Sequence, residues 1–141
     1  MKFDDKESGH HEGESVLADQ LKQTVRVYCF ILTTPDAKDK KAVHVKATWA
    51  QRFNGFEFIS SENDPSLPAL KAVEKESRSV LWQKTIFGMK NAYRKHFENF
   101  DFFMKADDDT YVIVENLRLL LSKLNPQDPI ILGRHFKVSR L

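Results

Sequence analysis

The sequence has little that could cross-link it or anchor it. It contains a single cysteine among 141 residues, so no internal disulfide can form, and Cys29 lies within an apolar run typical of a buried thiol. No apolar run is long enough to cross a bilayer, and the charged N-terminus lacks the hydrophobic segment of a signal peptide. The formal net charge is only +2, which gives no indication of nucleic acid or an anionic membrane as a partner.

Several familiar site motifs are also missing. No GxGxxG follows the first predicted strand, and no GxxxxGK[ST] occurs anywhere, which disfavours a dinucleotide-binding fingerprint and a P-loop nucleotide hydrolase. No Ser/His/Asp or Cys/His arrangement stands out, and a cysteine in mid-strand is a poor nucleophile. These absences leave metal-assisted binding of a phosphate-bearing ligand as the chemistry to examine.

The composition is that of one folded domain. Hydrophobic residues make up 41% of the chain and charged residues 30%, and there are eleven phenylalanines. Residues 1–15 are almost entirely polar and predict a mobile tail, in which the pair His10-His11 is solvated rather than metal-binding.

Strand and helix patterns alternate along the rest of the chain. They predict strands over 25–33, 56–60, 102–106 and 129–133, and helices over 40–53, 72–97 and from about 117 to 124. The alternation indicates an α/β fold: a Rossmann-like, mostly parallel open sheet with flanking helices. Apolar residues at helical spacing are predicted to face the core, namely Ala42, Val45, Trp49 and Phe53; Trp82, Ile86, Met89, Tyr93 and Phe97; and Leu117, Leu120, Leu121 and Leu124.

Three consecutive carboxylates, Asp107 to Asp109, end the predicted strand that begins at Phe102. One interpretation is an acidic turn that caps the next helix. The other is a metal–phosphate site, because hard divalent cations prefer carboxylate oxygens together with substrate phosphates. The loop from Thr33 to Asp36 leaves the same edge of the predicted sheet, where ligands bind in such folds. An Asp-x-Asp at that edge suits a sugar-nucleotide transferase, with the metal bridging the diphosphate.

Three runs in the sequence resemble a known family. Residues 44–52 (HVKATWAQR), 105–112 (KADDDTYV) and 116–123 (NLRLLLSK) look like core 1 β1,3-galactosyltransferases, the glycoprotein-N-acetylgalactosamine 3-β-galactosyltransferases, which are close to the fringe-like enzymes. The match extends from about residue 16 to 137. The resemblance implies a GT-A fold and the use of Mn2+ and UDP-galactose to extend O-linked GalNAc on Ser or Thr with inversion. It also implies a type II membrane protein of the Golgi lumen, with a homodimer as a candidate assembly.

The resemblance also implies roles for individual residues. Asp109 would ligate the metal directly, Asp107 would support the metal or the nucleotide, and Asp108 would face the donor sugar. Thr33 and Thr34 match the loop that holds the uridine in the family.

The helix before the acidic cluster matches the family as well, with one departure. Glu76 and Lys84 occupy the family's acidic and lysine positions, near the donor galactose and phosphates. Arg78 fits the same segment, but Ser79 stands where relatives tend to have Asp.

The resemblance further predicts which parts of the family enzyme this chain holds. Residues 16–137 would be a truncated GT-A donor-binding domain and residues 138–141 a C-terminal scar or tail. The catalytic base, a further metal-ligating His and the N-terminal anchor have no counterpart here, so the chain alone would turn over poorly or not at all. The alternative is a non-catalytic, chaperone-like or interacting relative of the galactosyltransferase. A chain of this extent is also predicted to expose apolar surface.

Overall fold

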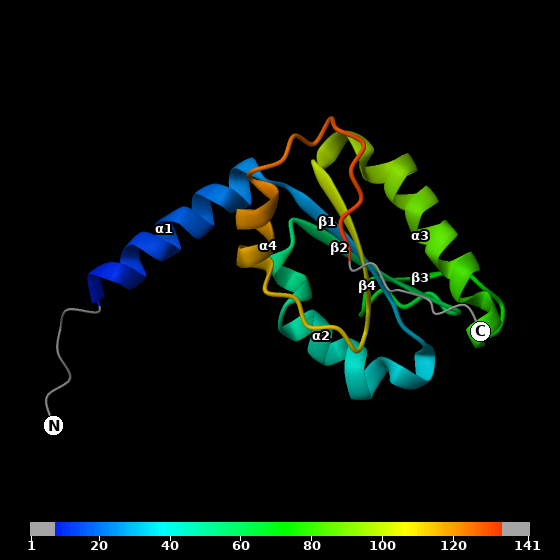
Figure 1. The fold of residues 1–141 in the computed structure, drawn as a ribbon. Helices are drawn as coiled ribbons and strands as arrows, with labels where there is room; N and C mark the ends of the chain where they lie inside the picture. Colours follow the sequence, from blue (N-terminus) through cyan, green and yellow to red (C-terminus); the bar gives the residue numbers. More distant parts are fainter. Residues whose placement is uncertain (1–7, 134–141) are drawn as a thin grey trace, which may run out of the picture.

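A four-stranded parallel sheet forms the centre of the molecule (Figure 1). The computed structural model describes residues 8–133. The strands are β1 (Val27–Leu32), β2 (Gly55–Ser60), β3 (Ala69–Lys71) and β4 (Phe102–Asp107), in the order β3-β2-β1-β4. Every neighbouring pair is parallel, which confirms the predicted α/β class with a Rossmann-like sheet.

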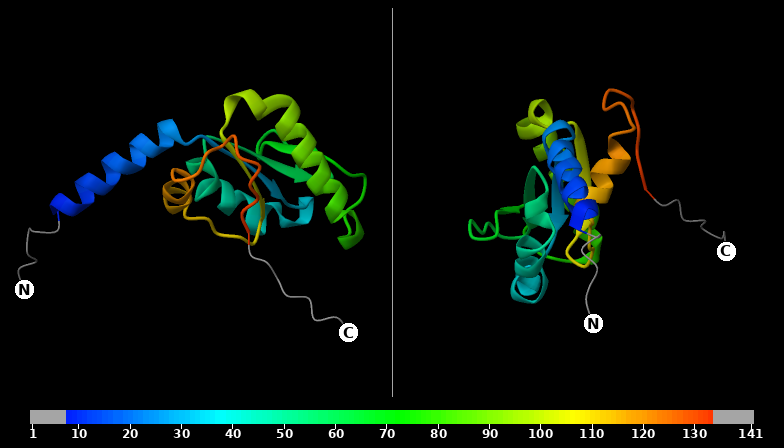
Figure 2. Two further views of the ribbon diagram at one scale, coloured as in Figure 1. Left: turned by 45° about the horizontal axis from the view of Figure 1, so that its top comes forward. Right: turned by 90° about the vertical axis from the view of Figure 1, so that its left-hand side faces the viewer.

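Four α-helices accompany the sheet. They are α1 (Ser8–Thr24), α2 (Val43–Ala47), α3 (Leu81–His96) and α4 (Val114–Leu121). Helix α3 covers one face of the sheet, α2 and α4 lie on the other, and α1 projects away from the body (Figures 1 and 2). None of the helices within residues 8–133 is both long enough and apolar enough to cross a membrane.

Strand β1 lies between β2 and β4, and all six of its residues are buried. Alternate side chains of a strand point to opposite faces. Tyr28, Phe30 and Leu32 therefore join the apolar cluster under α3, whereas the intervening residues join the larger cluster under α2 and α4. Burial raises the pKa of the Cys29 thiol to about 12, which agrees with the inert, buried cysteine predicted from the sequence.

The predicted strand over 129–133 is wrong. Residues 129–133 have no strand pairing, and Ile131 is almost fully exposed. A strand needs a neighbour for its backbone hydrogen bonds, and no strand within residues 8–133 pairs with this segment. The remaining strand is instead β3, which pairs with the end of β2 and was not predicted because only three residues contribute to it.

All three predicted helices have different bounds, and the one predicted from about 117 to 124 is α4, which begins at Val114 and ends at Leu121. The segment 40–53 is divided into a π-helical turn (Lys38–Ala42), α2 and a 3-10 turn (Ala50–Arg52). Its predicted core residues are nevertheless all buried, namely Ala42, Val45, Trp49 and Phe53. The helix predicted over 72–97 begins only at Leu81, after a 3-10 turn (Arg78–Val80), because residues 72–77 form an extended loop anchored by buried Val73.

The prediction that the apolar stripe of α3 faces the core is also wrong, because four of its five members are exposed and Ile86 is only partly buried. Its members with large exposed areas are Trp82, Met89, Tyr93 and Phe97. The face of α3 that packs on the sheet instead contains Lys84, Gly88, Asn91 and Ala92. Two small residues allow close approach to β1, and the two polar residues have hydrogen-bond partners.

Two smaller differences concern the other helices. Residues 8–15 belong to α1, although the sequence predicts a mobile tail there; residues 1–7 and 134–141 lie outside the described residues, and with them the predicted tail at 138–141. On α4, Leu121 is buried as predicted but Leu120 is exposed. Arg118, which was not predicted as a core residue, is also buried.

Candidate functional site

The loops after β1 and β4 meet at the carboxyl edge of the sheet. The strand register places Leu32 opposite Asp107, so the residues that follow them are neighbours. The Asp108 backbone N–H donates to the Leu32 carbonyl at 3.1 Å, and the Thr33 hydroxyl donates to Asp108 Oδ2 at 2.8 Å. The predicted convergence of these two loops is therefore present in the structure.

The three aspartates differ in their surroundings. The Asp107 carboxylate forms an ion pair with the Lys105 ammonium, with 2.7 Å between Oδ1 and Nζ. Asp108 is bound by Thr33 and lies 3.5 Å from the Lys41 ammonium. Asp109 is exposed, and its carboxylate makes no recorded hydrogen bond or ion pair within residues 8–133.

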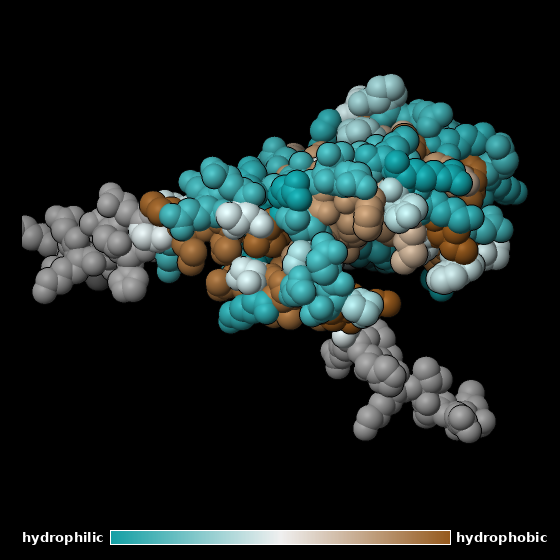
Figure 3. Space-filling model, turned by 90° about the horizontal axis from the view of Figure 1, so that it is seen from above, coloured by the Kyte–Doolittle hydropathy of each residue, from teal (hydrophilic) through white to brown (hydrophobic). Residues whose placement is uncertain are grey.

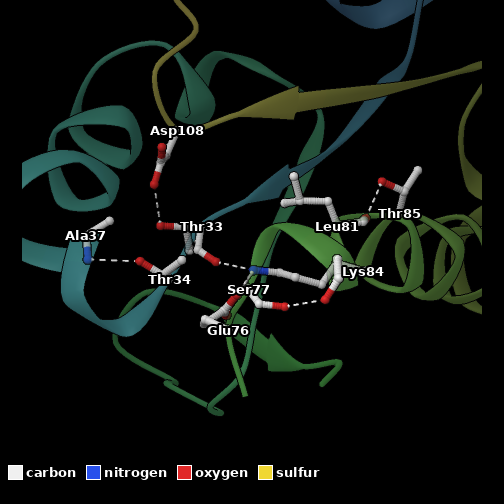
Figure 4. Close-up of polar contacts among 10 residues, drawn as sticks. Thr33, Thr34, Ala37, Glu76, Ser77, Leu81, Lys84, Thr85 and Asp108 are labelled. Carbon is white, nitrogen blue, oxygen red and sulfur yellow. Dashed lines mark hydrogen bonds and ion pairs between the residues drawn. The ribbon is translucent and has the colours of Figure 1, made fainter. Parts of the chain in front are cut away.

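Most of the predicted site residues line one open cavity of about 260 Å3 (Figure 4 shows the polar contacts of Thr33, Lys84 and Asp108). Its walls are Leu32, Thr33, Thr34, Leu81, Lys84, Thr85, Lys105, Asp107, Asp108 and Asp109. The Thr34 hydroxyl accepts a hydrogen bond from the Ala37 N–H and so caps the 3-10 turn Pro35–Ala37. Thr33 and Thr34 are thus fixed by local turn geometry as well as by the sheet.

Glu76 reaches the cavity only through Lys84. Both of its carboxylate oxygens accept from the Lys84 ammonium at 2.9 Å. Arg78 and Ser79 are exposed on the turn before α3, where the hydroxyls of Ser79 and Ser77 lie 2.7 Å apart. The structure thus brings Glu76 and Lys84 together but does not bring Arg78 or Ser79 to the cavity wall.

Sequence reasoning missed a second cavity beside the first. It has a volume of about 290 Å3 and shares Thr33 and Thr34 with the first cavity. The Lys38 ammonium lies 2.5 Å from Asp64 across its rim, and β3 supplies part of its wall. The polar loop 61–68 supplies much of the wall, and its position depends on the unpredicted strand β3.

The acidic turn fits a divalent cation that is shared with a phosphate ligand. Within the part of the chain that the structure describes, no group of three or more His, Cys, Asp or Glu side chains could hold a metal by itself. Mg2+-like cations, however, are usually held by one or two carboxylates plus substrate phosphates. Asp109 offers a carboxylate without a recorded partner, and Asp107 is engaged only in an exposed ion pair, which costs little to displace.

Known proteins with similar sequences point to one family. The sequence model of the Fringe-like family matches residues 22–139. Glycoprotein-N-acetylgalactosamine 3-beta-galactosyltransferase 1 of Xenopus laevis is 38% identical over 128 residues, which cover 91% of this chain and 36% of that protein.

More distant similarity connects the chain to larger proteins. Chondroitin sulfate synthase 3 of Mus musculus is 26% identical over 118 residues, covering 77% of this chain and 13% of that protein. The human protein of the same name is 26% identical over 116 residues, with the same coverage. The chain therefore spans between about an eighth and a third of the curated relatives it matches. These matches confirm the resemblance found in the sequence runs, and the chain belongs to the Fringe-like family.

Proposed function

We propose that this chain binds a nucleotide sugar together with a divalent cation, as the donor-binding part of a glycosyltransferase. One observation carries the proposal: the acidic turn and the Thr33–Thr34 loop, from two parallel strands, line a single cavity at the carboxyl edge of the sheet. That edge is where open α/β sheets bind ligands. Membership of the Fringe-like family and the similarity to a galactosyltransferase support the same reaction class.

The proposed ligands are UDP-galactose and Mn2+. Asp109 and Asp107 would hold the cation, which would neutralise charge on the diphosphate as the nucleoside diphosphate leaves. Thr33 and Thr34 line both the acidic cavity and the second cavity, and the uridine would occupy the second one. Asp108 would face the sugar, although its carboxylate is held by Thr33.

The finer assignment is galactose transfer to O-linked GalNAc on Ser or Thr of a glycoprotein. It is supported by the similarity to the Xenopus enzyme, whose name states galactose transfer to N-acetylgalactosamine of a glycoprotein. We further propose the Golgi lumen as the location and a homodimer as the assembly, on the family resemblance of the sequence runs alone. None of the residues in these proposed roles is a catalytic base, so ligand binding rather than turnover tests the proposal.

Calorimetric titration of UDP, with and without Mn2+, tests the proposal. We expect binding that requires the cation, and we expect Asp109→Asn to weaken it by about tenfold or more because a charged cation ligand is lost. Asp128→Asn is the matched control, since Asp128 is an exposed carboxylate that lines neither cavity. UDP binding by folded protein that is independent of Mn2+, or equal in both variants, would contradict the cation site.

The exposed stripe of α3 favours a second candidate, a non-catalytic protein that binds or chaperones another chain. The same titration separates the two. A folded wild-type chain that binds no UDP at any Mn2+ concentration would favour this second function.

A further inference from the structure

Lys84 is a charged side chain in the interior, with only 1% of its surface exposed. Its ammonium donates to the carbonyl oxygen of Thr33 and to both carboxylate oxygens of Glu76 (Figure 4). An ammonium group has three N–H donors, so all of them have protein acceptors. Lys84 therefore has no donor left for a phosphate or a sugar hydroxyl, although it lies in the cavity wall.

Thr33 connects this ion pair to the acidic turn. Its carbonyl accepts from Lys84, its N–H donates to the Ile59 carbonyl at 3.0 Å, and its hydroxyl donates to Asp108 Oδ2 at 2.8 Å. Each hydrogen-bonding group of Thr33 thus has a partner on a different element. A shift of the Thr33 carbonyl would move the hydroxyl that orients Asp108.

Stability alone does not explain a charge at this position. A buried ion pair is often no more stabilising than well-packed apolar residues of similar volume. On the same buried face of α3, Gly88 and Ala92 are small residues that pack without a polar partner, unlike Lys84. The charge at Lys84 is instead directed at one backbone carbonyl, next to the acidic turn.

We propose that Lys84, paired with Glu76, is a positioning residue that holds the Thr33 loop against the acidic turn and thereby orients Asp108. It acts through Thr33 and does not contact the ligand. This differs from the role near galactose and phosphates that the family resemblance implies. The inference rests on the proposed function for the identity of the ligand, UDP with Mn2+, but its structural part concerns the ligand-free protein.

Amide hydrogen exchange of the ligand-free protein tests the structural part. In Lys84→Met we expect the Thr33 and Asp108 amides to exchange about tenfold faster or more, because their loop opens locally. The Tyr28 amide, at the far end of β1, should be unchanged. Glu76→Gln removes the carboxylate charge that pairs with Lys84, with a smaller change of shape than Lys84→Met, and should affect the same two amides. It provides a second test if Lys84→Met does not fold.

Lys90→Met is the matched control for Lys84→Met, since Lys90 is an exposed lysine on the same helix. Wild-type exchange rates for Thr33 and Asp108 in folded Lys84→Met or Glu76→Gln would overturn the proposal. This result does not depend on whether the protein binds UDP.

A double-mutant cycle tests whether Lys84 acts through Thr33. Lys84→Met and Thr33→Val, which removes the hydroxyl bond to Asp108, should each weaken Mn2+-dependent binding of UDP-galactose, which carries the sugar that Asp108 would face, by about tenfold, and together by no more than either alone. Losses that multiply would show that Lys84 contacts the ligand independently and would overturn the proposal. Absence of UDP binding by the wild type would count against the proposed function alone, and hydrogen exchange would then decide the positioning role.

Discussion

Asp64, which lines the second cavity, has a shifted pKa and so makes a contribution to stability that depends on pH. Its carboxylate lies 2.5 Å from the Lys38 ammonium and accepts from the Ser66 hydroxyl at 2.6 Å. The hydrogen bond from Lys38, followed by that from Ser66, lowers the pKa of Asp64 to about 2. Because the folded-state pKa lies below the unfolded value of about 3.9, the contribution to stability is present above pH ~4 and is lost as the pH falls toward 2.

We predict that Lys38→Ala raises the pKa of Asp64 part of the way to its ordinary value of 3.8, because the Ser66 bonds remain. The measurement is the titration of the Asp64 carboxyl carbon by NMR. Lys40→Ala is the control, since Lys40 is an exposed neighbour whose ammonium makes no recorded contact with Asp64 in the described residues. Equal Asp64 midpoints in wild type and Lys38→Ala would contradict the assignment.

At the scale of elements, the sequence shows which residues share a face of a helix or strand better than it shows which other element packs on that face. The buried strand β1, the acidic turn after β4 and the parallel order follow from apolar runs and from the alternation of strands and helices. Periodicity also shows correctly that Trp82, Met89 and Tyr93 share one face of α3. It does not show whether another element covers that face, and here none of the described elements does.

Hydrophobic periodicity could not predict which face of α3 is buried, because two of the buried residues are polar and depend on particular hydrogen-bond partners. Lys84 and Asn91 are buried since Glu76, Thr33 and Glu57 supply their hydrogen-bond partners, which lie far away in the sequence or in a loop. The same holds at the site, where the acidic turn was predictable from its own residues. Its restraint by Thr33 was not, because it depends on the register of β1 against β4.

Gly88 determines how closely α3 approaches β1. A Cβ atom placed there would collide with the ring of Phe30, which is itself buried. We predict that Gly88→Ala lowers the free energy of unfolding by about 1 kcal/mol, because overpacking costs of about 1–3 kcal/mol exceed the gain in helix propensity of about 1 kcal/mol. Urea denaturation measures the difference.

Gln83→Ala is the control for helix propensity, since Gln83 is exposed on the same helix. It should leave the unfolding free energy unchanged within about 0.5 kcal/mol. An unfolding free energy of Gly88→Ala at or above that of the wild type would mean that α3 can move away from β1 without loss.

On the scale of the whole molecule, apolar surface is distributed unevenly. Figure 3 shows hydrophobic residues exposed along the α1 arm, where Val16 and Leu17 lie. The larger collection is the α3 stripe, which borders a mostly apolar cavity of about 310 Å3 lined by Phe30, Met89, Ala92, Tyr93, Phe97, Phe103 and Lys105. This cavity lies beside β4, an edge strand whose outer side pairs with no strand in the described chain. This cavity forms an apolar groove beside an open sheet edge, a kind of surface that favours the association of chains.

We therefore predict that the protein self-associates as its concentration rises, and that Tyr93→Ser reduces this association. Tyr111→Ser is a closely matched control, because the two tyrosines are 68% and 72% exposed but only Tyr93 lines the groove. Sedimentation velocity over a concentration series measures the association, and thermal melts of both variants confirm that the fold is retained. Since an exposed side chain contributes little to folding, both melts should stay near that of the wild type. If Tyr93→Ser and Tyr111→Ser change the association equally, the groove is not the surface through which the chains meet.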